Sequence, residues 1–380
     1  MDYEDKHYYL AFSYFQKIGP IAMKKLDAAF PYIYEVFFAS AAKLERAGLK
    51  PALVREFVLW RDSPAASIDK MIAELKKERI SFITWHDPEY PGLLKEISAP
   101  PFLLYYKGRL DNAKNNLAVV GSRKFSAYGE KAINELLPLA IEAEINIISG
   151  LALGIDALAH QKALNLKGKT WAILGSGLDD KNIYPPDNRR LAQAIIDKGG
   201  ALISEFPPGA PPLKQNFPQR NRIIAGLAQA TLVVEAREKS GALITADYAL
   251  DSNRDVLAVP GNIFSESSAG PNKLIKQGAK TIAEATDILE AYGLTPRPDG
   301  RSDKRKHKKE GSSPSSFSLD NETEALVYKI LEEAAERAEK ISVDEIVRRT
   351  ELDTSVINST LSILELRGIA KNSESGYDVN

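Results

Sequence analysis

The stretch LAVVGSRKFSAYGEKAINELLPLAIEAEINIISG, residues 117–150, places an apolar run, a turn, a helical segment and a second apolar run in succession. Both runs are short and apolar, as expected of strands that are buried on both faces of a sheet. The alternation continues through the runs TWAIL, ALISE, ATLVVEA and VLAVP, with helical stretches such as IDALAHQKAL and RRLAQAIIDK between them. This order predicts an α/β fold with a doubly wound, mostly parallel sheet. In such sheets ligands bind beyond the carboxyl ends of the strands.

The segments before this pattern predict a helical domain and a connector. Residues 1–75 carry apolar residues at helical spacing in YYLAFSYFQKI, AMKKLDAAF and ALVREFVLW. The break at Ile18-Gly19-Pro20 resembles half of a helix-hairpin-helix, a motif that holds a phosphate on backbone amides. Lys17 replaces the usual first glycine of that motif, so a helical bundle that serves only for packing is the competing interpretation. The sheet domain is expected over 76–292, with a connector at 76–115 that includes the strand-like pieces ISFITW and FLLYYKG.

The segments after the sheet pattern predict a linker and a further module. Residues 293–318 are rich in Pro, Gly, Ser and charge, which is typical of a flexible tether, and their KRKHKK core could touch phosphates nonspecifically. Residues 319–380 read as three helices and a hairpin-like tail, which predicts a winged helix. Residues 321–380 hold 7 Lys and Arg against 13 Asp and Glu, a net charge of -6. Because domains that read DNA are normally basic, we expect this module to contact protein.

The composition of the 380 residues excludes several classes of site. The chain has no cysteine, which rules out disulfides and thiolate metal ligands, and its four histidines are scattered. We therefore expect no metal and no cofactor. The N-terminus lacks a signal-peptide pattern and no apolar run reaches the ~20 residues of a membrane helix, so a cytoplasmic protein without a membrane span is expected. The formal net charge of -1 means that any nucleic-acid site must be a local patch.

Such a patch is predicted at one edge of the sheet. Residues 117–290 hold 19 Lys and Arg and 19 Asp and Glu, so the sheet region is neutral as a whole. Its successive strand ends nevertheless carry glycines, small polar residues and cations, which bind anions through backbone amides and guanidinium forks. Because the carboxyl ends of parallel strands share one edge, we expect an anion site made by Gly121, Ser122, Arg123, Gly150, Asn188, Arg189, Lys214, Arg220, Asn221, Arg222, Ser240 and Gly241. Arg220 and Arg222 are expected to form one wall, facing Arg123. Whether both reach the ligand or one braces the loop is open.

Asp156 and His160 lie four residues apart on the helix after the second strand, and therefore on one face. That spacing allows a catalytic dyad. The alternative is that Asp156 caps the helix and His160 makes a buried hydrogen bond. Since the motif contains no nucleophile and no second carboxylate, we favour the structural interpretation.

Seven ordered motifs resemble the DNA-processing protein A family, also called Smf. They are VGSR, SGLALGIDALAH, YPPDN, FPQRNRIIAGL, SGALIT, RDVLAVPG and LIKQGAK, and YPGLLKEISAPPFLLYYKG extends the match through the connector. The resemblance implies a Rossmann-like domain between an N-terminal helical domain, similar to SAM or helix-hairpin-helix domains, and a C-terminal winged helix. It implies a non-catalytic protein of natural transformation that binds and protects single-stranded DNA, loads a RecA-type recombinase on it and forms a homodimer.

The resemblance also assigns residues. Gly121, Ser122 and Arg123 match the family's phosphate-binding turn, and Arg220, Asn221 and Arg222 match its basic segment. Leu274 and Ile275 lie in its self-association segment. Where some members have a lysine, this chain has Pro186, and either Arg189 or Arg190 could supply that charge.

Two enzyme classes compete with this interpretation. A nucleoside-monophosphate phosphoribohydrolase has a related fold, but its PGGxGTxxE segment corresponds here to KSGALITADYA, without the glutamate. A dinucleotide-dependent dehydrogenase needs an acidic ribose acceptor after the second strand, where this chain has SGLALG. For bases stacked on aromatic side chains, Tyr184, Phe206 and Phe217 are the candidates.

Overall fold

The computed structural model describes residues 3–111, 114–294, 322–335, 340–350, 352–366, 370–373 and 376–379. The chain divides into two compact units, Met1–Asp303 and Lys304–Asn380. The predicted linker at 293–318, with its KRKHKK segment, lies outside the described residues except for Gly293 and Leu294.

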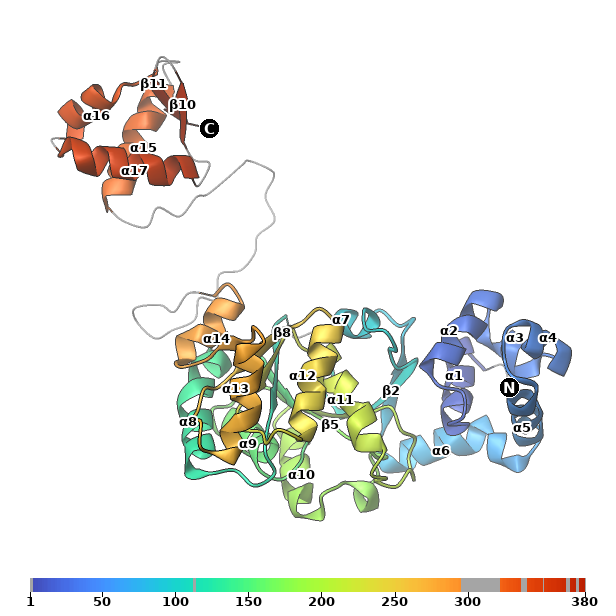
Figure 1. Cartoon of the computed structure of the whole chain (residues 1–380). Coiled ribbons are helices and arrows are strands. Elements are labelled where there is room, and N and C mark those ends of the chain that lie inside the picture. Colours follow the sequence, from blue (N-terminus) through green and yellow to red (C-terminus); the bar gives the residue numbers. More distant parts are fainter. Residues whose placement is uncertain are drawn as a thin grey trace. The chain divides into compact units, whose positions relative to one another are not determined.

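A single sheet organises the first unit (Figure 1). In the described residues its strand order is β1-β2-β6-β5-β4-β3-β7-β8-β9. The pairs β1–β2 and β2–β6 are antiparallel and all the others are parallel, so the predicted doubly wound, mostly parallel sheet is confirmed. The strands are β1 (Ser81–Thr84), β2 (Leu103–Gly108), β3 (Asn116–Val120), β4 (Asn146–Ser149), β5 (Thr170–Ile173), β6 (Ala201–Ser204), β7 (Ala230–Val233), β8 (Asp255–Ala258) and β9 (Lys280–Thr281).

Helices cover both faces of the sheet, which is why its central strands are apolar on both sides. Ala118 and Val120 pack toward one layer of helices, whereas Leu117 and Val119 pack toward the other. The first layer contains α7 (Gly92–Lys95), α11 (Asn216–Gly226), α12 (Gly241–Asp251) and α13 (Ala269–Lys276). The second contains α8 (Ala127–Glu142), α9 (Ile155–Asn165), α10 (Arg189–Asp197) and α14 (Ala285–Ala291). Short 3-10 turns lie at Pro64–Ala66, Asp180–Asn182, Pro186–Asn188 and Glu266–Ser268.

The N-terminal helices share a core with the sheet. Phe12 and Phe57 stack with ring centroids 5.0 Å apart, and their apolar cluster continues into Tyr105 of β2 and Ile195 of α10. The buried hydroxyls of Ser13 and Tyr105 also form a hydrogen bond. The predicted helical region is therefore packed directly onto the sheet. Its helices are α1 (Asp5–Tyr14), α2 (Pro20–Ala29), α3 (Ile33–Phe38), α4 (Ala41–Arg46), α5 (Pro51–Arg61) and α6 (Ile68–Glu78).

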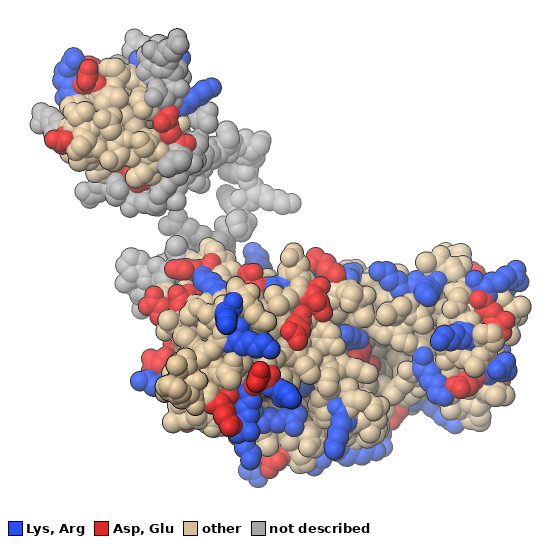
Figure 2. Space-filling model, in the orientation of Figure 1, with Lys and Arg blue, Asp and Glu red and all other residues tan. Residues whose placement is uncertain are grey.

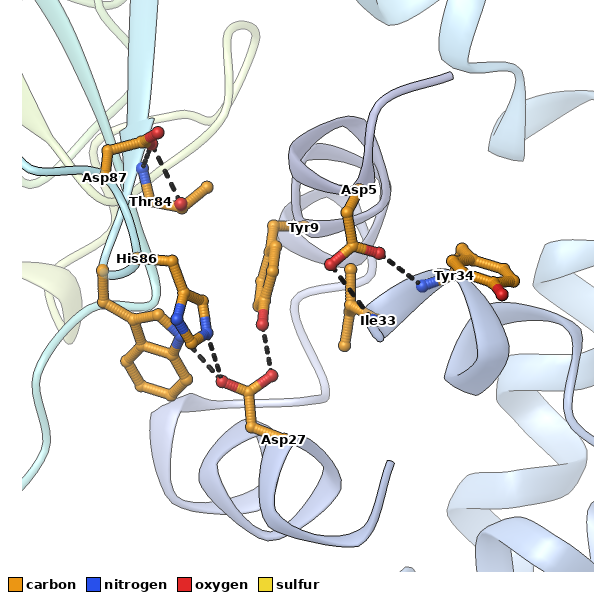
Figure 3. A network of polar contacts seen from close by, with 9 residues as sticks. Asp5, Tyr9, Asp27, Ile33, Tyr34, Thr84, His86 and Asp87 are labelled. Carbon is orange, nitrogen blue, oxygen red and sulfur yellow. Dashed lines mark hydrogen bonds and ion pairs between the residues drawn. The ribbon is translucent and has the colours of Figure 1, made fainter. Parts of the chain in front are cut away.

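A polar network centred on Asp27 of α2 joins these helices to the connector (Figure 3). One carboxylate oxygen accepts a hydrogen bond from the Tyr9 hydroxyl. The other lies 2.9 Å from the Trp85 indole Nε1 and 2.7 Å from His86 Nε2. Burial and the nearby Asp27 carboxylate both raise the pKa of Tyr9, so its hydroxyl remains a donor. One carboxylate thus ties α1, α2 and the turn after β1 together.

The second unit contains the predicted winged helix, and this prediction is confirmed. Three helices, α15 (Glu322–Ala335), α16 (Val343–Thr350) and α17 (Thr354–Leu366), precede the antiparallel hairpin of β10 (Ala370–Ser373) and β11 (Gly376–Val379). Val327, Ile346, Ile357 and Leu361 are fully buried at its centre. No helix among the described residues of either unit is both long and apolar enough to cross a bilayer.

Candidate nucleic-acid interface

A groove of about 680 Å³ lies beyond the carboxyl ends of the central strands. Loops that follow β3, β4, β5, β6 and β7 line it, which is the arrangement that the parallel sheet predicts. In Figure 2, lysine and arginine side chains gather near the lower ends of α12 and α13, at this edge of the sheet. The predicted residues that line the groove are Gly121, Ser122, Arg123, Lys214, Arg220, Asn221, Ser240 and Gly241.

Arg123 is an exposed cation of the first turn. It makes no hydrogen bond or ion pair with any residue that the structure describes, so its guanidinium is free to meet an anion. The turn itself is fixed, because the Ser122 hydroxyl lies 2.6 Å from the Lys124 carbonyl and 3.1 Å from the Lys124 backbone nitrogen. A side chain at Gly121 would come within 2.9 Å of Ile155 in α9, so glycine is needed for the turn to lie against that helix.

Arg220 is a buried brace. Only 5% of the residue is exposed, and its Nη1 donates hydrogen bonds to the carbonyls of Gly150, at 2.8 Å, and Ile173. It thereby joins the ends of β4 and β5. A Cβ atom at position 150 would lie 2.6–2.7 Å from the guanidinium, so the glycine makes room for the arginine. Burial lowers the pKa of Arg220 to about 10, which still leaves it charged at neutral pH.

Arg222 lies outside the groove, and the expectation that it forms one wall with Arg220 is wrong. Its Nη2 pairs with a carboxylate oxygen of Glu205 at 2.5 Å, and only 14% and 15% of the two side chains are exposed. Residues 220 and 222 lie on different sides of α11, since two residues span about 200° around a helix axis. Arg222 lines a separate cavity of about 790 Å³ between the helical region and the sheet, and so does Phe206.

Asn221, Ser240 and Gly241 line the groove, and hydrogen bonds fix the chain there. The Asn221 amide donates to the Gly241 carbonyl at 3.1 Å and accepts a hydrogen bond from Arg220 Nε. The Ser240 hydroxyl caps α12 by accepting from the Ala242 amide. The start of α12 is thereby fixed against α11 beside the groove, where its N-terminal partial charge favours an anion.

Asn188, Arg189 and Arg190 do not line the groove. Asn188 is buried and its amide donates to the carbonyls of Leu151 and Ala152, at 2.8 and 3.2 Å. Arg189 turns back to the Lys181 carbonyl at 2.8 Å. Neither arginine is among the residues that line the groove, so the prediction that one of them replaces the lysine stays a prediction. Asn188 contributes indirectly, because it holds the loop after β4 in place.

Two groove cations were missed in the sequence. Arg237 and Lys239 line the groove from the loop between β7 and α12. The sequence does show these two charges, because Arg237 and Lys239 directly precede the predicted site residue Ser240. Lys214 and Lys239 make no ion pair within the described residues, whereas Arg237 pairs with Glu266 at 3.2 Å.

An aromatic pair lines the groove between these cations. The rings of Tyr184 and Phe217 lie 5.6 Å apart at an angle of 48°, and Tyr184 is 42% exposed. Exposed rings beside cations suit bases attached to phosphates. Two of the three predicted aromatic candidates therefore line the groove.

The predicted buried hydrogen bond of His160 is confirmed, but the expectation that Asp156 caps its helix is wrong, because Gly154 is the N-cap of α9 and no side chain caps it. Asp156 accepts hydrogen bonds from the backbone amides of Gly150 and Ala152, at 3.1 and 3.4 Å, and so fixes the loop before its own helix. His160 is fully buried, with Nδ1 2.6 Å from the Thr170 hydroxyl. Burial lowers its pKa to about 3, so the imidazole is neutral. Among the residues that the structure describes, no cluster of His, Asp and Glu could hold a metal ion.

The predicted self-association residues differ in exposure. Leu274 is buried in the core of the sheet domain, and Ile275 is only partly exposed beside it. Leu274 lines a hollow of about 290 Å³, and Leu250, which also lines it, is 59% exposed. Leu250 is the apolar residue of this surface that the sequence did not single out.

The fold and the groove define a Rossmann-like α/β protein with a cationic, aromatic-lined groove at its strand ends. Comparison with known families assigns it further. The family model described as DNA recombination-mediator protein A matches residues 81–293, and that of the DprA winged helix domain matches residues 313–373. The chain belongs to the DNA recombination-mediator protein A family, as the sequence motifs predicted.

Individual relatives agree with this assignment. Protein Smf of Synechocystis is 38% identical over 301 residues, which cover 78% of this chain and 74% of the relative. The DNA processing protein DprA of Streptococcus pneumoniae is 45% identical over 223 residues, 58% of this chain and 78% of the relative. The crystal structure of DprA from S. pneumoniae superposes with a TM-score of 0.62 at 36% identity, over 76% of this chain and 98% of that one.

Proposed function

We propose that the chain binds single-stranded DNA in this groove without regard to sequence, protects it, and loads a RecA-type recombinase on it. The observation that carries the proposal is Arg123, an exposed guanidinium that has no partner among the described residues and lines a groove that also holds Lys214 and Lys239. Cations and backbone amides bind phosphates and do not distinguish between bases. The affinity should therefore be independent of sequence and should fall as the salt concentration rises. Tyr184 and Phe217 offer stacking surfaces that unpaired bases can reach.

The proposed role is non-catalytic. The two residues whose spacing allowed a dyad are engaged in structural hydrogen bonds: Asp156 with backbone amides and His160 with Thr170. Incubation with purine and pyrimidine nucleoside monophosphates should therefore release no free base. Release of base that is lost in Arg123→Ala would favour the phosphoribohydrolase alternative.

The groove is tested with Arg123→Ala. We expect about tenfold weaker binding of an oligo-dT strand at low salt, since hydrogen bonds to charged groups contribute about 1.5–3 kcal/mol. The slope of log affinity against log salt should fall by about 1. Fluorescence anisotropy at several salt concentrations measures both. Arg190→Ala is the matched control, because Arg190 is exposed but lies outside the groove. Equal losses in both variants, or none in either, would contradict the site.

Self-association is proposed at the surface around Leu274 and Ile275. Ile275→Glu places a charge next in sequence to Leu274, which lines the same hollow as Leu250, and light scattering should then give the monomer mass. Leu153→Glu, a substitution of an exposed leucine on the loop between β4 and α9, is the control and should leave the mass unchanged.

Loading of the recombinase is tested by measuring how fast its filaments form on strands already coated by a single-strand binding protein. The chain should accelerate it, and Arg123→Ala should not.

A further inference from the structure

Four large apolar or aromatic side chains are exposed beside the groove, two on the loop and first helical turn after β3 and two on the loop after β8. Phe125 and Tyr128, after β3, are 39% and 47% exposed, and Ile263 and Phe264, after β8, are 79% and 90% exposed. We call these four residues the apolar ledge. They lie at the carboxyl ends of the strands, on the same edge of the sheet as the groove. Exposed apolar side chains gathered in one place mark binding surfaces.

The buried residue Glu235, which is 1% exposed, fixes the segments that carry the ledge. Its carboxylate accepts hydrogen bonds from the Ser126 amide at 2.9 Å, the Ser126 hydroxyl at 2.6 Å and the Ser267 hydroxyl at 2.9 Å. The Ala236 amide also donates to the Ser267 carbonyl at 2.7 Å. This buried acid therefore holds the loops after β3, β7 and β8 together.

Further hydrogen bonds order the ledge residues themselves. The Tyr128 hydroxyl donates to the Pro260 carbonyl at 2.6 Å, which joins the two halves of the ledge. The Asn272 amide bonds to both backbone groups of Gly261, at 3.0 and 3.1 Å. The Phe264 amide donates to the Asn262 side chain at 2.9 Å. Phe264 is thus presented to solvent by an ordered turn, which reduces the entropy lost when a ligand binds there.

The ledge continues the groove. Phe125 follows Arg123 and the exposed Lys124, and Arg237 of the groove pairs with Glu266, two residues after Phe264. A strand whose phosphates meet Arg123 would meet the cations at this border next, with its bases beside apolar side chains. Cations next to exposed aromatic rings form the combination that binds unpaired nucleic acid.

We propose that the apolar ledge stacks the bases of single-stranded DNA that extends out of the groove. The ledge thereby lengthens the binding site toward β8. This inference rests on the proposed function of the groove and names a second part of its site. It predicts that affinity rises with oligonucleotide length because bases reach Phe264.

The test compares short and long oligo-dT strands with Phe264→Ala, using fluorescence anisotropy of the full chain. Stacking one base on an aromatic side chain changes affinity by about fivefold or more, so the variant should bind the long strand about fivefold more weakly and the short strand equally. Phe264→Trp should restore binding. The control is Phe38→Ala, which removes a ring that is 65% exposed on α3. The wild-type chain should quench the fluorescence of a 2-aminopurine base placed near one end of the long strand, and Phe264→Ala should quench it less.

The outcomes separate the ledge from the groove. If Arg123→Ala weakens both strands while Phe264→Ala matches wild type on both, the ledge is refuted and the groove stands. If Arg123→Ala weakens neither strand, the proposed function itself fails. If Phe264→Ala changes the molecular mass in light scattering but not the binding of the long strand, the ledge is a surface between copies of the chain and the inference is overturned.

Discussion

Three arginines expected at one site have three different environments. Arg123 is exposed without a partner among the described residues, Arg220 is buried under the groove, and Arg222 pairs with Glu205 on another side. The charge of an arginine is constant, so its surroundings decide its role. Only Arg123 among them can present a whole guanidinium to DNA, while Arg220 holds the strand ends that shape the groove.

The close approach of Gly150 and Arg220 gives a stability prediction. In Gly150→Ala the new methyl group would lie 2.6–2.7 Å from the guanidinium of Arg220. The Arg220 side chain and the backbone at position 150 would have to shift apart. We expect a loss of about 1–3 kcal/mol in the free energy of unfolding, measured by chemical denaturation. Gly92→Ala is the control, since an added Cβ meets nothing within 4 Å at that exposed helix start. Equal stability of the two variants would mean that Arg220 is not held as described.

His160 predicts a pH dependence. Its folded-state pKa of about 3 lies below the ~6.5 of an unfolded histidine, so between these values the unfolded chain binds a proton that the folded chain does not. Stability should therefore fall as the pH falls from about 6.5 toward 3, by at most about 1.4 kcal/mol per pH unit from this group. His160→Asn keeps a donor toward Thr170 and does not titrate, so it should lose less stability over the same range.

That comparison also isolates His160 from Asp156. Burial raises the pKa of Asp156, with Arg220 opposing the shift, so acidification favours its folded form and acts in the opposite direction. Both proteins retain Asp156, and its effect cancels in the difference. Unfolding curves at pH 7 and pH 4.5 suffice. Parallel losses in the two proteins would exclude His160 as the cause.

At the scale of elements, single carboxylates join segments that are distant in sequence. Glu235 holds three loops beside the groove, and Asp27 joins α1, α2 and the turn after β1. In both cases a partly or fully buried acid accepts several hydrogen bonds, which offsets the cost of its burial. These contacts fix how the loops and helices lie on the sheet.

Asp27→Ala should weaken the attachment of the helical region. It leaves Tyr9, Trp85 and His86 without their shared acceptor, and we expect a loss of about 2–4 kcal/mol in the free energy of unfolding. Guanidinium denaturation followed by tryptophan fluorescence reports on this unit, because all three tryptophans lie before residue 172. Asp62→Ala, which removes an exposed carboxylate paired with Arg61, should cost no more than about 0.5 kcal/mol. Equal losses would contradict the network.

At the scale of the whole molecule, the groove and the apolar ledge lie within the described residues 114–294, and the winged helix forms a separate compact unit. Residues 321–380 have a net charge of -6. The described surface of α17, the helix that would enter a DNA groove, presents Val356 and Ile363 at 41% and 38% exposure. The negative charge of this segment would repel DNA, and the helix face is partly apolar. Both features favour the predicted protein-binding role of this unit.

Removal of residues 295–380 should therefore change affinity for single-stranded DNA by no more than about twofold, because the remaining chain holds the whole site and loses net negative charge. Anisotropy at equal ionic strength measures it. The full chain with Arg123→Ala provides the weak-binding reference. A tenfold loss on truncation would assign DNA contacts to the removed segment.

The sequence by itself determined the layers of the fold and the edge of the sheet that carries the groove. Strand and helix periodicity is local, and the carboxyl ends of parallel strands must share one edge, so Gly121, Arg123, Lys214 and Ser240 could be predicted together. Only the tertiary structure decided which side chains are free. The pairing of Arg222 with Glu205, the burial of Arg220 against Gly150 and the hydrogen bond of Ser267 to Glu235 all join residues at least 17 positions apart. Such contacts depend on how loops pack across strands, and no local pattern encodes that.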